Sequence, residues 1–268
     1  MKNKKMAPIG VFDSGVGGLT VAREISRQLP YENIVYFGDT ARVPYGSKSQ
    51  NTIIRFSEQI IRFLRTKQVK AIVIACNTAS AFALDAVQHE QDIPVLGVIG
   101  AGAKVAAEET VNKRVGVIGT VGTVGSGIHE AYLKKLDPKI TVIGKACPLF
   151  VPLVEEGWLH DPVTVEVANR YLQELKDKDV DTLILGCTHY PLLKPLLKAE
   201  APGITLVDSA LTTAEAAAQA LAAADLLNSG NGSADYRFYV SDIPLRFRTI
   251  GERFLGRSME QIEMVSLG

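Results

Sequence analysis

Two of the three cysteines in this chain stand in similar surroundings at distant places. Cys76 and Cys187 each end a short apolar run, and each precedes a side chain that can form hydrogen bonds, Asn77 or Thr188. A continuous apolar run of this kind is typical of a parallel strand covered on both faces. Because ligands of open parallel sheets bind at the carboxyl ends of the strands, both thiols are predicted to face a ligand.

Two thiols that face one substrate could invert a carbon that bears hydrogen. Inversion removes a proton from one face and delivers one to the other, so it suits two groups of similar pKa, one deprotonated and one protonated. Free cysteine has a pKa of about 8.5, and the helix starts expected after both cysteines favour the thiolate. Asp13 or His189 could accept or relay a proton. Asn77, Thr78 and Thr188 could hold a carboxylate and an ammonium group.

The cysteine count argues against other uses of these thiols. Three cysteines without a CxxC pattern predict neither a disulfide framework nor a zinc site, and we expect no metal. Cys147 lies between apolar neighbours and is predicted to be a small buried hydrophobic residue.

The composition indicates a folded protein without a strong net charge. The 268 residues leave room for one large domain or two of ordinary size, and 47% apolar residues are enough for a sizeable core. The 29 basic and 29 acidic side chains balance, so no basic surface for nucleic acid is indicated.

The start of the chain carries no pattern of a targeting segment. The lysine-rich residues 1–5 are not followed by the apolar core of a signal peptide, because Pro8, Gly10 and Asp13 interrupt it. No apolar run approaches the roughly 20 residues of a membrane span. We therefore expect a cytoplasmic protein that does not bind membranes.

The first half of the chain has the order of elements of an α/β unit. Residues 8–12 are predicted to form a buried strand, 13–18 a glycine-rich turn, and 19–29 an amphipathic helix. Glycines in such a turn let backbone amides approach an anion at the helix start. The turn lacks the lysine of a Walker sequence and the glycine spacing of the dinucleotide fingerprint, so it does not indicate a nucleotide site. It is instead interpreted as an anion-facing turn that carries the carboxylate of Asp13.

A second polar loop follows the next predicted strand. Pro44 and Gly46 surround Tyr45 in this loop, which makes its tip rigid and suited to presenting backbone groups to a ligand. An ordinary surface turn is the alternative.

The second half repeats the order of the first with little sequence identity. A strand at 114–119 and a Gly/Thr-rich turn at 120–126 correspond to the opening strand and turn, and the Cys187 segment corresponds to the Cys76 segment. The repeat predicts an α/β fold of two similar lobes, each a mainly parallel sheet flanked by helices, with a cleft between them.

The remaining elements follow from periodicity and capping signals. Asp161 and Pro162 are predicted to start a helix with an apolar stripe of Val163, Val167, Tyr171 and Leu175. Thr212 and Glu215 are predicted to form a capping box, and the tail could pack on either lobe. Further strands are expected at 33–37, 71–75, 94–99, 139–143, 180–185, 204–207 and 236–240, and further helices at 52–67, 78–87, 127–136 and 250–255.

Four motifs together resemble a known family. They are residues 13–21, 43–46, 75–79 and 186–191, which are similar in type and order to the bacterial glutamate racemases of the aspartate/glutamate racemase superfamily. The match spans essentially the whole chain, and the first and last motifs are the most specific.

The resemblance implies an isomerase that interconverts L- and D-glutamate without a cofactor and supplies D-glutamate for peptidoglycan. It implies a first domain of residues 1–98 plus 208–268 and a second of 99–207, with the active site between them. The residues that match the family's acid/base groups are Cys76 and Cys187; those that match its substrate contacts are Asp13, Ser14, Tyr45, Gly46, Asn77, Thr78, Thr188 and His189.

Further expectations concern two other acids and the binding partners. Asp39 and Glu155 resemble family acids, and a solvated carboxylate is the alternative for each. The expected partner is the small-molecule substrate glutamate. We also expect a homodimer, as is common for cytosolic enzymes of this size.

Four other functions stay open at this point. A racemase of aspartate or of a hydantoin would use the same chemistry, although His189 and the Tyr45 loop favour glutamate. A two-lobed binding protein for amino acids is usually exported. A hydrolase or transferase with one thiol would use Cys187 with His189 and leave Cys76 unexplained. A pyridoxal-phosphate racemase needs a lysine that neither cysteine motif carries.

Overall fold

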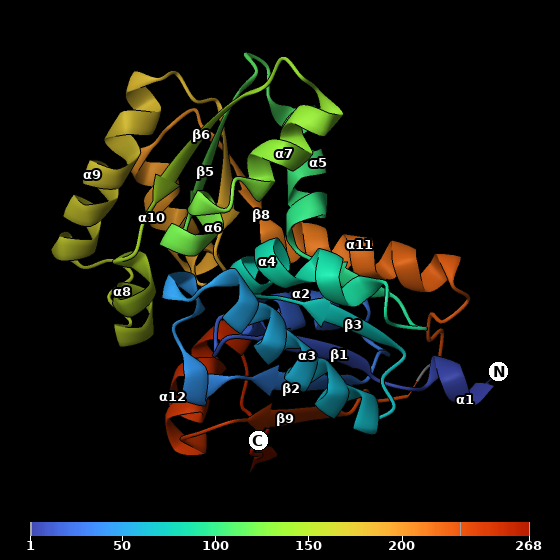
Figure 1. Cartoon of the computed structure of the whole chain (residues 1–268). Coiled ribbons are helices and arrows are strands. Elements are labelled where there is room, and N and C mark those ends of the chain that lie inside the picture. The colour runs from blue at the N-terminus through green and yellow to red at the C-terminus, as the bar shows by residue number, and fades with distance from the viewer. Residues whose placement is uncertain (1, 231, 268) are drawn as a thin grey trace.

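Two parallel sheets form the framework of the protein (Figure 1). The structure is a computed structural model that describes residues 2–230 and 232–267. All strand pairs in both sheets are parallel. The first sheet has the order β10-β9-β2-β1-β3-β4, and the second has the order β6-β5-β7-β8. This arrangement confirms the predicted α/β fold with two sheets flanked by helices.

The strands have the following bounds. The first sheet contains β1 (Ile9–Asp13), β2 (Ile34–Gly38), β3 (Ala71–Ile74), β4 (Val95–Gly97), β9 (Tyr236–Val240) and β10 (Ile262–Met264); the second contains β5 (Arg114–Gly119), β6 (Thr141–Ala146), β7 (Thr182–Gly186) and β8 (Thr205–Asp208).

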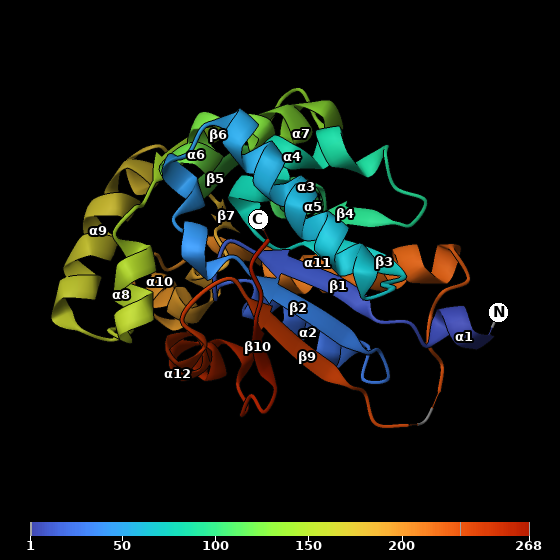
Figure 2. The ribbon, with the colours of Figure 1, turned by 60° about the horizontal axis from the view of Figure 1, so that its bottom comes forward.

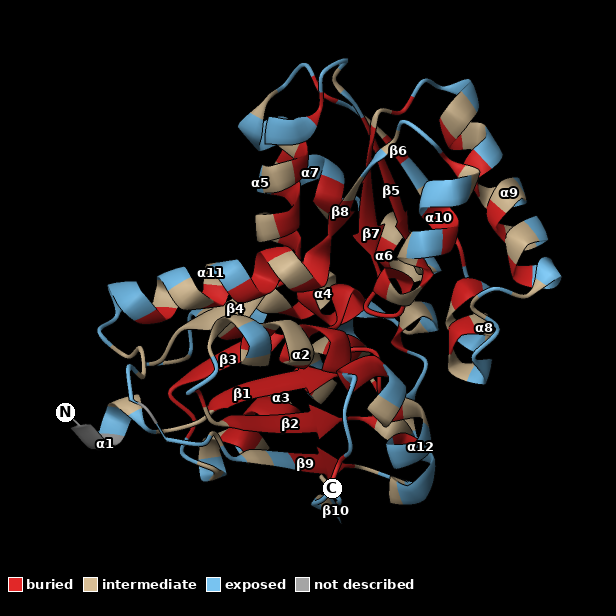
Figure 3. Ribbon diagram, turned by 180° about the vertical axis from the view of Figure 1, so that it is seen from behind, coloured by how far each residue is buried: buried red, intermediate tan, exposed pale blue. Residues whose placement is uncertain are grey.

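Helices cover both sheets, as Figures 2 and 3 show from two further directions. The strands are mostly buried, whereas the outward faces of the helices are exposed. The helices are α1 (Lys2–Lys5), α2 (Leu19–Gln28), α3 (Gln50–Thr66), α4 (Asn77–Gln88), α5 (Ile99–Glu109), α6 (Val121–Gly125), α7 (Ile128–Leu136), α8 (Phe150–Glu156), α9 (Pro162–Asp177), α10 (Lys194–Glu200), α11 (Ser209–Ala223) and α12 (Pro244–Leu255), with short 3-10 turns η1 (Thr40–Arg42), η2 (Tyr45–Ser47) and η3 (Tyr190–Leu193).

Side chains of β1 alternate between two cores, as expected for a strand covered on both faces. Val11 packs in a cluster that includes Leu19 and Ile25 of α2. Phe12 packs in a second cluster that includes Ile53 and Ile60 of α3. The apolar stripes predicted for these helices therefore hold them on opposite faces of the first sheet.

The end of the chain returns to the first lobe, a point that the residue pattern left open and that the resemblance implied. β9 pairs with β2, β10 pairs with β9, and α12 packs against α2. The predicted division into residues 1–98 plus 208–268 and residues 99–207 follows the same distribution of strands, and we keep these bounds as a proposal.

Two predicted helix starts are wrong. α11 begins at Ser209, where Asp208 Oδ1 accepts a hydrogen bond of 2.9 Å from the amide of Ala210, so Thr212 lies inside the helix and no capping box forms. The predicted helix at 250–255 begins earlier, because Pro244 suits a first helical turn.

The predicted start of α9 is confirmed, and its predicted stripe is confirmed in part. Asp161 caps the helix and Pro162 is its first residue. The buried positions are Thr164, Ala168, Leu172 and Leu175, and Val163 is 52% exposed. Leu175 is thus buried as predicted, Val167 and Tyr171 are half-buried against the core, and Val163 is wrong as a core position.

Within the described part of the chain, no helix has both the length and the apolar character needed to cross a membrane.

Replacement of the α11 cap should lower stability. We expect Asp208→Ala to reduce the free energy of unfolding by about 1 kcal/mol, because the amide of Ala210 loses its acceptor. Asp208→Asn is the matched control: it keeps the cap and loses only the partly exposed ion pair with Lys194, so its effect should be smaller. Urea unfolding measures both variants, and equal losses would contradict the role of the cap.

Candidate active site

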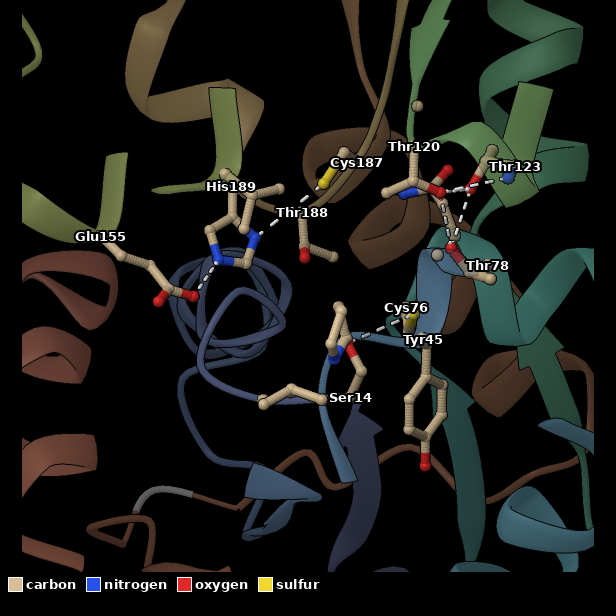
Figure 4. A pocket seen from close by; sticks show the side chains of 17 residues that line it. Ser14, Tyr45, Cys76, Thr78, Thr120, Thr123, Glu155, Cys187, Thr188 and His189 are labelled. Carbon is tan, nitrogen blue, oxygen red and sulfur yellow. Dashed lines mark hydrogen bonds and ion pairs between the residues drawn. The ribbon is translucent and has the colours of Figure 1, made fainter. Parts of the chain in front are cut away.

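A cavity of about 250 Å³ lies where the two sheets face each other (Figure 4). Its walls come from the residues that follow β1 and β3 in the first lobe and β5 and β7 in the second. In each sheet these two strands are neighbours. After one of them the chain continues toward one edge of the sheet, and after the other it continues toward the opposite edge. This is the topological switch point at which open parallel sheets bind ligands, and here two switch points share one cavity.

Nine of the ten predicted site residues line this cavity. They are Ser14, Tyr45, Gly46, Cys76, Asn77, Thr78, Cys187, Thr188 and His189. Asp13 lies behind the wall and is fully buried. Its carboxylate accepts hydrogen bonds from the amide of Gly15 at 2.9 Å and from Thr188 Oγ1 at 3.5 Å. The structure thus brings the predicted residues together, and their individual roles stay a prediction.

Cys76 occupies the N-cap of α4. Its sulfur accepts a hydrogen bond from the amide of Ala79 at 3.4 Å and donates to Ser14 Oγ at 3.7 Å. Burial raises the pKa of the Cys76 thiol to about 12, and the charge of Asp13 adds to the rise, while the bonds from Ala79 and Ser14 lower it. The amide of Ala79 at the helix start thus lowers the pKa of Cys76, as predicted, but the loss of solvation raises this pKa by more.

Cys187 has a different neighbourhood. No α-helix starts directly after it, since the chain passes through Thr188 and His189 into the 3-10 turn η3. Its sulfur lies 3.9 Å from His189 Nδ1. Figure 4 shows Cys187 entering the cavity from one lobe and Cys76 from the other. The predicted effect of a helix start thus does not apply at Cys187, and the imidazole takes its place.

His189 connects Cys187 to a half-buried acid, Glu155. Its Nε2 lies 3.0 Å from Glu155 Oε1. Burial lowers the pKa of His189, but the hydrogen bonds and the negative charges of Cys187 and Glu155 outweigh this and raise the pKa to about 10. Burial raises the pKa of Glu155, but the hydrogen bond to His189 and the charge of His189 lower it by more. The net result is a lowered pKa for Glu155. The imidazole therefore lies between the Glu155 carboxylate and the sulfur of Cys187, with its pKa raised well above neutral pH.

Asn77 has an unused polar side chain at the cavity wall. It is 2% exposed, and neither Oδ1 nor Nδ2 has a hydrogen-bond partner among the described residues. A buried amide without partners costs about 1–3 kcal/mol per group, and a polar ligand would remove that cost. The geometry favours a ligand that can both donate and accept hydrogen bonds.

A hydrogen bond between Asp39 and Tyr45 explains the positions of both side chains. The Tyr45 hydroxyl donates to Asp39 and points away from the cavity, so Tyr45 presents mainly its backbone there. Asp39 is fully buried and also accepts two hydrogen bonds, of 2.9 and 2.7 Å, from Arg42 Nε. The alternative of a solvated carboxylate is therefore wrong for Asp39. This acid holds the loop and does not line the cavity.

Thr120 and Thr123 line the cavity and were not predicted. Their hydroxyls lie 3.0 Å apart, and the hydroxyl of Thr78 lies 2.9 Å from the first and 3.0 Å from the second. The three hydroxyls form a triangle that joins the two lobes. The Gly/Thr-rich turn after β5 corresponds to the turn that carries Ser14, and this correspondence could have identified them.

The side chains around the cavity suit proton transfer and not metal binding. Across residues 2–230 and 232–267, no cluster of three or more histidine, cysteine, aspartate or glutamate side chains could hold a metal ion. What the cavity offers is two thiols from opposite lobes, each with its own neighbouring acid or base. Such an arrangement can exchange protons with one ligand from two directions.

Comparisons with known proteins point to one family. A family model described as Asp/Glu/Hydantoin racemase matches residues 9–217. A glutamate racemase of Neisseria meningitidis serogroup B is 57% identical, and one of Syntrophus aciditrophicus is 53% identical, each over 98% of both chains. The crystal structure of the Francisella tularensis glutamate racemase in complex with D-glutamate is similar with a TM-score of 0.92 and 44% identity, over 98% of both chains.

The unusual basicity of His189 can be tested directly. A group whose pKa in the folded state lies above its ordinary value of 6.5 stabilises the fold fully below that pH, and the contribution disappears as pH rises through about 10. Glu155→Gln should lower the pKa of His189 and move this loss of stability to lower pH. NMR titration of the imidazole and urea unfolding at several pH values measure the two effects. Glu156→Gln, at the exposed neighbour, is the control and should leave both unchanged.

Proposed function

We propose that this chain, which belongs to the Asp/Glu/hydantoin racemase family, is a glutamate racemase that interconverts L- and D-glutamate. The observation that carries the proposal is a single cavity lined by two buried thiols from opposite lobes. The relatives named glutamate racemase, at up to 57% identity over nearly the whole chain, support the choice of substrate. The complex of the Francisella protein with D-glutamate supports it further.

The reaction that this geometry suits is a proton exchange at the α-carbon by two bases. One sulfur, as a thiolate, removes the α-proton from one face of glutamate. The other sulfur, as a thiol, donates a proton to the opposite face of the resulting carbanion. The two thiols thereby exchange protonation states, and no cofactor takes part. Cys76 and Cys187 are the two groups, and the direction of the reaction decides which acts as the base.

The polar residues of the cavity would hold the substrate. We assign the α-carboxylate and α-ammonium groups to the unpartnered amide of Asn77 and to Thr78, Thr188 and Ser14. The backbone at Tyr45 and Gly46 lies on the rim of the cavity and offers donors to the second carboxylate. A zwitterionic dicarboxylate would satisfy donors and acceptors on all sides, as the buried polar groups require.

The two sulfurs lie in different electrostatic surroundings. Burial and then the charge of Asp13 raise the pKa of Cys76, so we assign the neutral thiol to this residue. The imidazole of His189 lies 3.9 Å from Cys187 Sγ, so it is placed to stabilise the negative charge that this sulfur carries when it acts as the base. Asp13 and His189 are then the groups that return protons between turnovers.

The cellular role follows from the product. D-glutamate is a building block of peptidoglycan, so the activity would supply cell-wall synthesis and support cell shape. We propose that the enzyme works in the cytoplasm, as a homodimer, with the domains 1–98 plus 208–268 and 99–207 closing on the substrate.

Substrate choice can be decided in deuterated water. We expect incubation with L-glutamate to abolish optical rotation and to replace the α-proton with deuterium, while L-aspartate keeps both its rotation and its α-proton. Polarimetry and proton NMR follow the two changes. Exchange with aspartate and none with glutamate would overturn the proposed substrate, and exchange with neither would overturn the racemase assignment.

The two thiols can be tested by conservative replacement. Cys76→Ser and Cys187→Ser should each lower kcat for racemisation about 10²–10⁴-fold, because a hydroxyl is a much weaker acid than a thiol. Affinity for glutamate should change far less, since the polar residues of the cavity stay in place. Cys147→Ala is the matched control, because this buried third cysteine does not line the cavity. Full activity in either serine variant would contradict the two-base mechanism, and an acyl-enzyme trapped on Cys187 would favour a hydrolase.

A further inference from the structure

A second cleft in the second lobe lies directly behind the active site. It has a volume of about 250 Å³, the same as that of the active-site cavity. It lies between β5, β6 and the start of α7, elements that are adjacent in Figure 1. Its lining residues are Val117, Thr123, Val124, Gly127, His129, Glu130, Val142 and Gly144.

The polar centre of this cleft is His129. The side chain is 4% exposed, and its Nδ1 is buried without a hydrogen-bond partner among the described residues. Burial lowers the pKa of His129 to about 4, so the ring is neutral at physiological pH. A neutral imidazole has one nitrogen that donates and one that accepts. An acceptor on a ligand would select the form in which Nδ1 carries the proton.

The backbone next to His129 also favours an acceptor with negative charge. His129 lies in the first turn of α7, a helix of nine residues, where amide groups lack partners within the helix and the helix dipole is positive. Gly127, which precedes the helix, has a left-handed conformation with φ of 66°. No atom lies within 4 Å of the point that a β-carbon at Gly127 would occupy, so the approach to the helix start is open.

The remaining walls determine which anion fits. Val117, Val124 and Val142 provide apolar contacts for a short hydrocarbon chain. The Glu130 carboxylate also lines the cleft and would oppose an anion. It is 56% exposed and lies 4.0 Å from Lys134 Nζ, so solvent and this cation reduce its effect. A singly charged ligand is therefore favoured over a doubly charged one.

We propose that this cleft is a binding site for a short-chain monocarboxylate, with the carboxylate at His129 and the start of α7 and the alkyl chain against the three valines. Occupancy should affect turnover, a part of the proposal that rests on the proposed function. Thr123 lines both cavities. The ring of His129 also lies against Gly186, the residue before Cys187, where an added β-carbon would be 3.5 Å from Cε1.

Titration with propionate tests the site without reference to activity. NMR signals of the four histidine rings are followed while glutamate saturates the active site. We expect a saturable shift of the His129 signal and no change at the exposed His160. Calorimetric titration measures propionate binding in the variants, because His129→Phe lacks the ring signal. His129→Phe and Gly144→Val should each weaken propionate binding at least about tenfold, the first by removing the donor and the second by adding volume to the wall. His160→Phe is the control and should bind propionate as the wild type does.

Several results would overturn the proposal. They are a linear shift without saturation, a response only at His189 that glutamate abolishes, or unchanged binding in both cleft variants. The effect on turnover is measured separately, at saturating glutamate. We expect propionate to change kcat at least twofold in the wild type and not in Gly144→Val, and an unchanged kcat would overturn the regulatory part. If glutamate is not turned over at all, the proposed function fails, while the NMR result still decides the site.

Discussion

The close approach of two turns from different lobes is the constraint on which the site depends. Gly17 lies so near the Cys187 segment that an added β-carbon would be 2.2 Å from Thr188 Oγ1 and 2.5 Å from His189 Nδ1. Thr20 Oγ1 donates a hydrogen bond of 3.0 Å to the carbonyl of Thr188 at the same contact. Because this turn has no side chain at Gly17, the end of β7 can lie against the end of β1. The cavity and the apposition of the two thiols follow from that contact.

The two sulfurs are alike in type and differ in their electrostatic surroundings. Cys76 lies near a buried carboxylate, that of Asp13, which disfavours a second negative charge. Cys187 lies near an imidazole that Glu155 keeps protonated. The proposed reaction on mirror-image substrates needs a base and an acid at the same time, and unequal surroundings of the two sulfurs suit that need.

The returning C-terminal segment stabilises the surroundings of Cys187. Arg253 of α12 donates hydrogen bonds to the carbonyls of Val154 at 3.3 Å and Glu155 at 3.2 Å, which belong to α8 of the other lobe. Phe254 packs its ring against that of His189 with a centroid distance of 5.1 Å. A helix distant in sequence thus fixes the acid and the imidazole that face Cys187. The sequence could not show this, since the tail carries no motif of its own.

The sequence by itself determined the elements and the chemistry, because both depend on local pattern: apolar runs form the buried strands, and the residues after them lie at the carboxyl ends. Nine of the ten site residues that the resemblance implied, most of which lie just after these strands, line the cavity. Tertiary structure decided what depends on distant contacts. It placed the tail on the first lobe, turned Val163 of α9 outward, and buried Cys76 so that desolvation outweighs the helix start. Solvation and close packing depend on contacts between segments that are distant in the sequence, so the pattern of a single segment does not predict them.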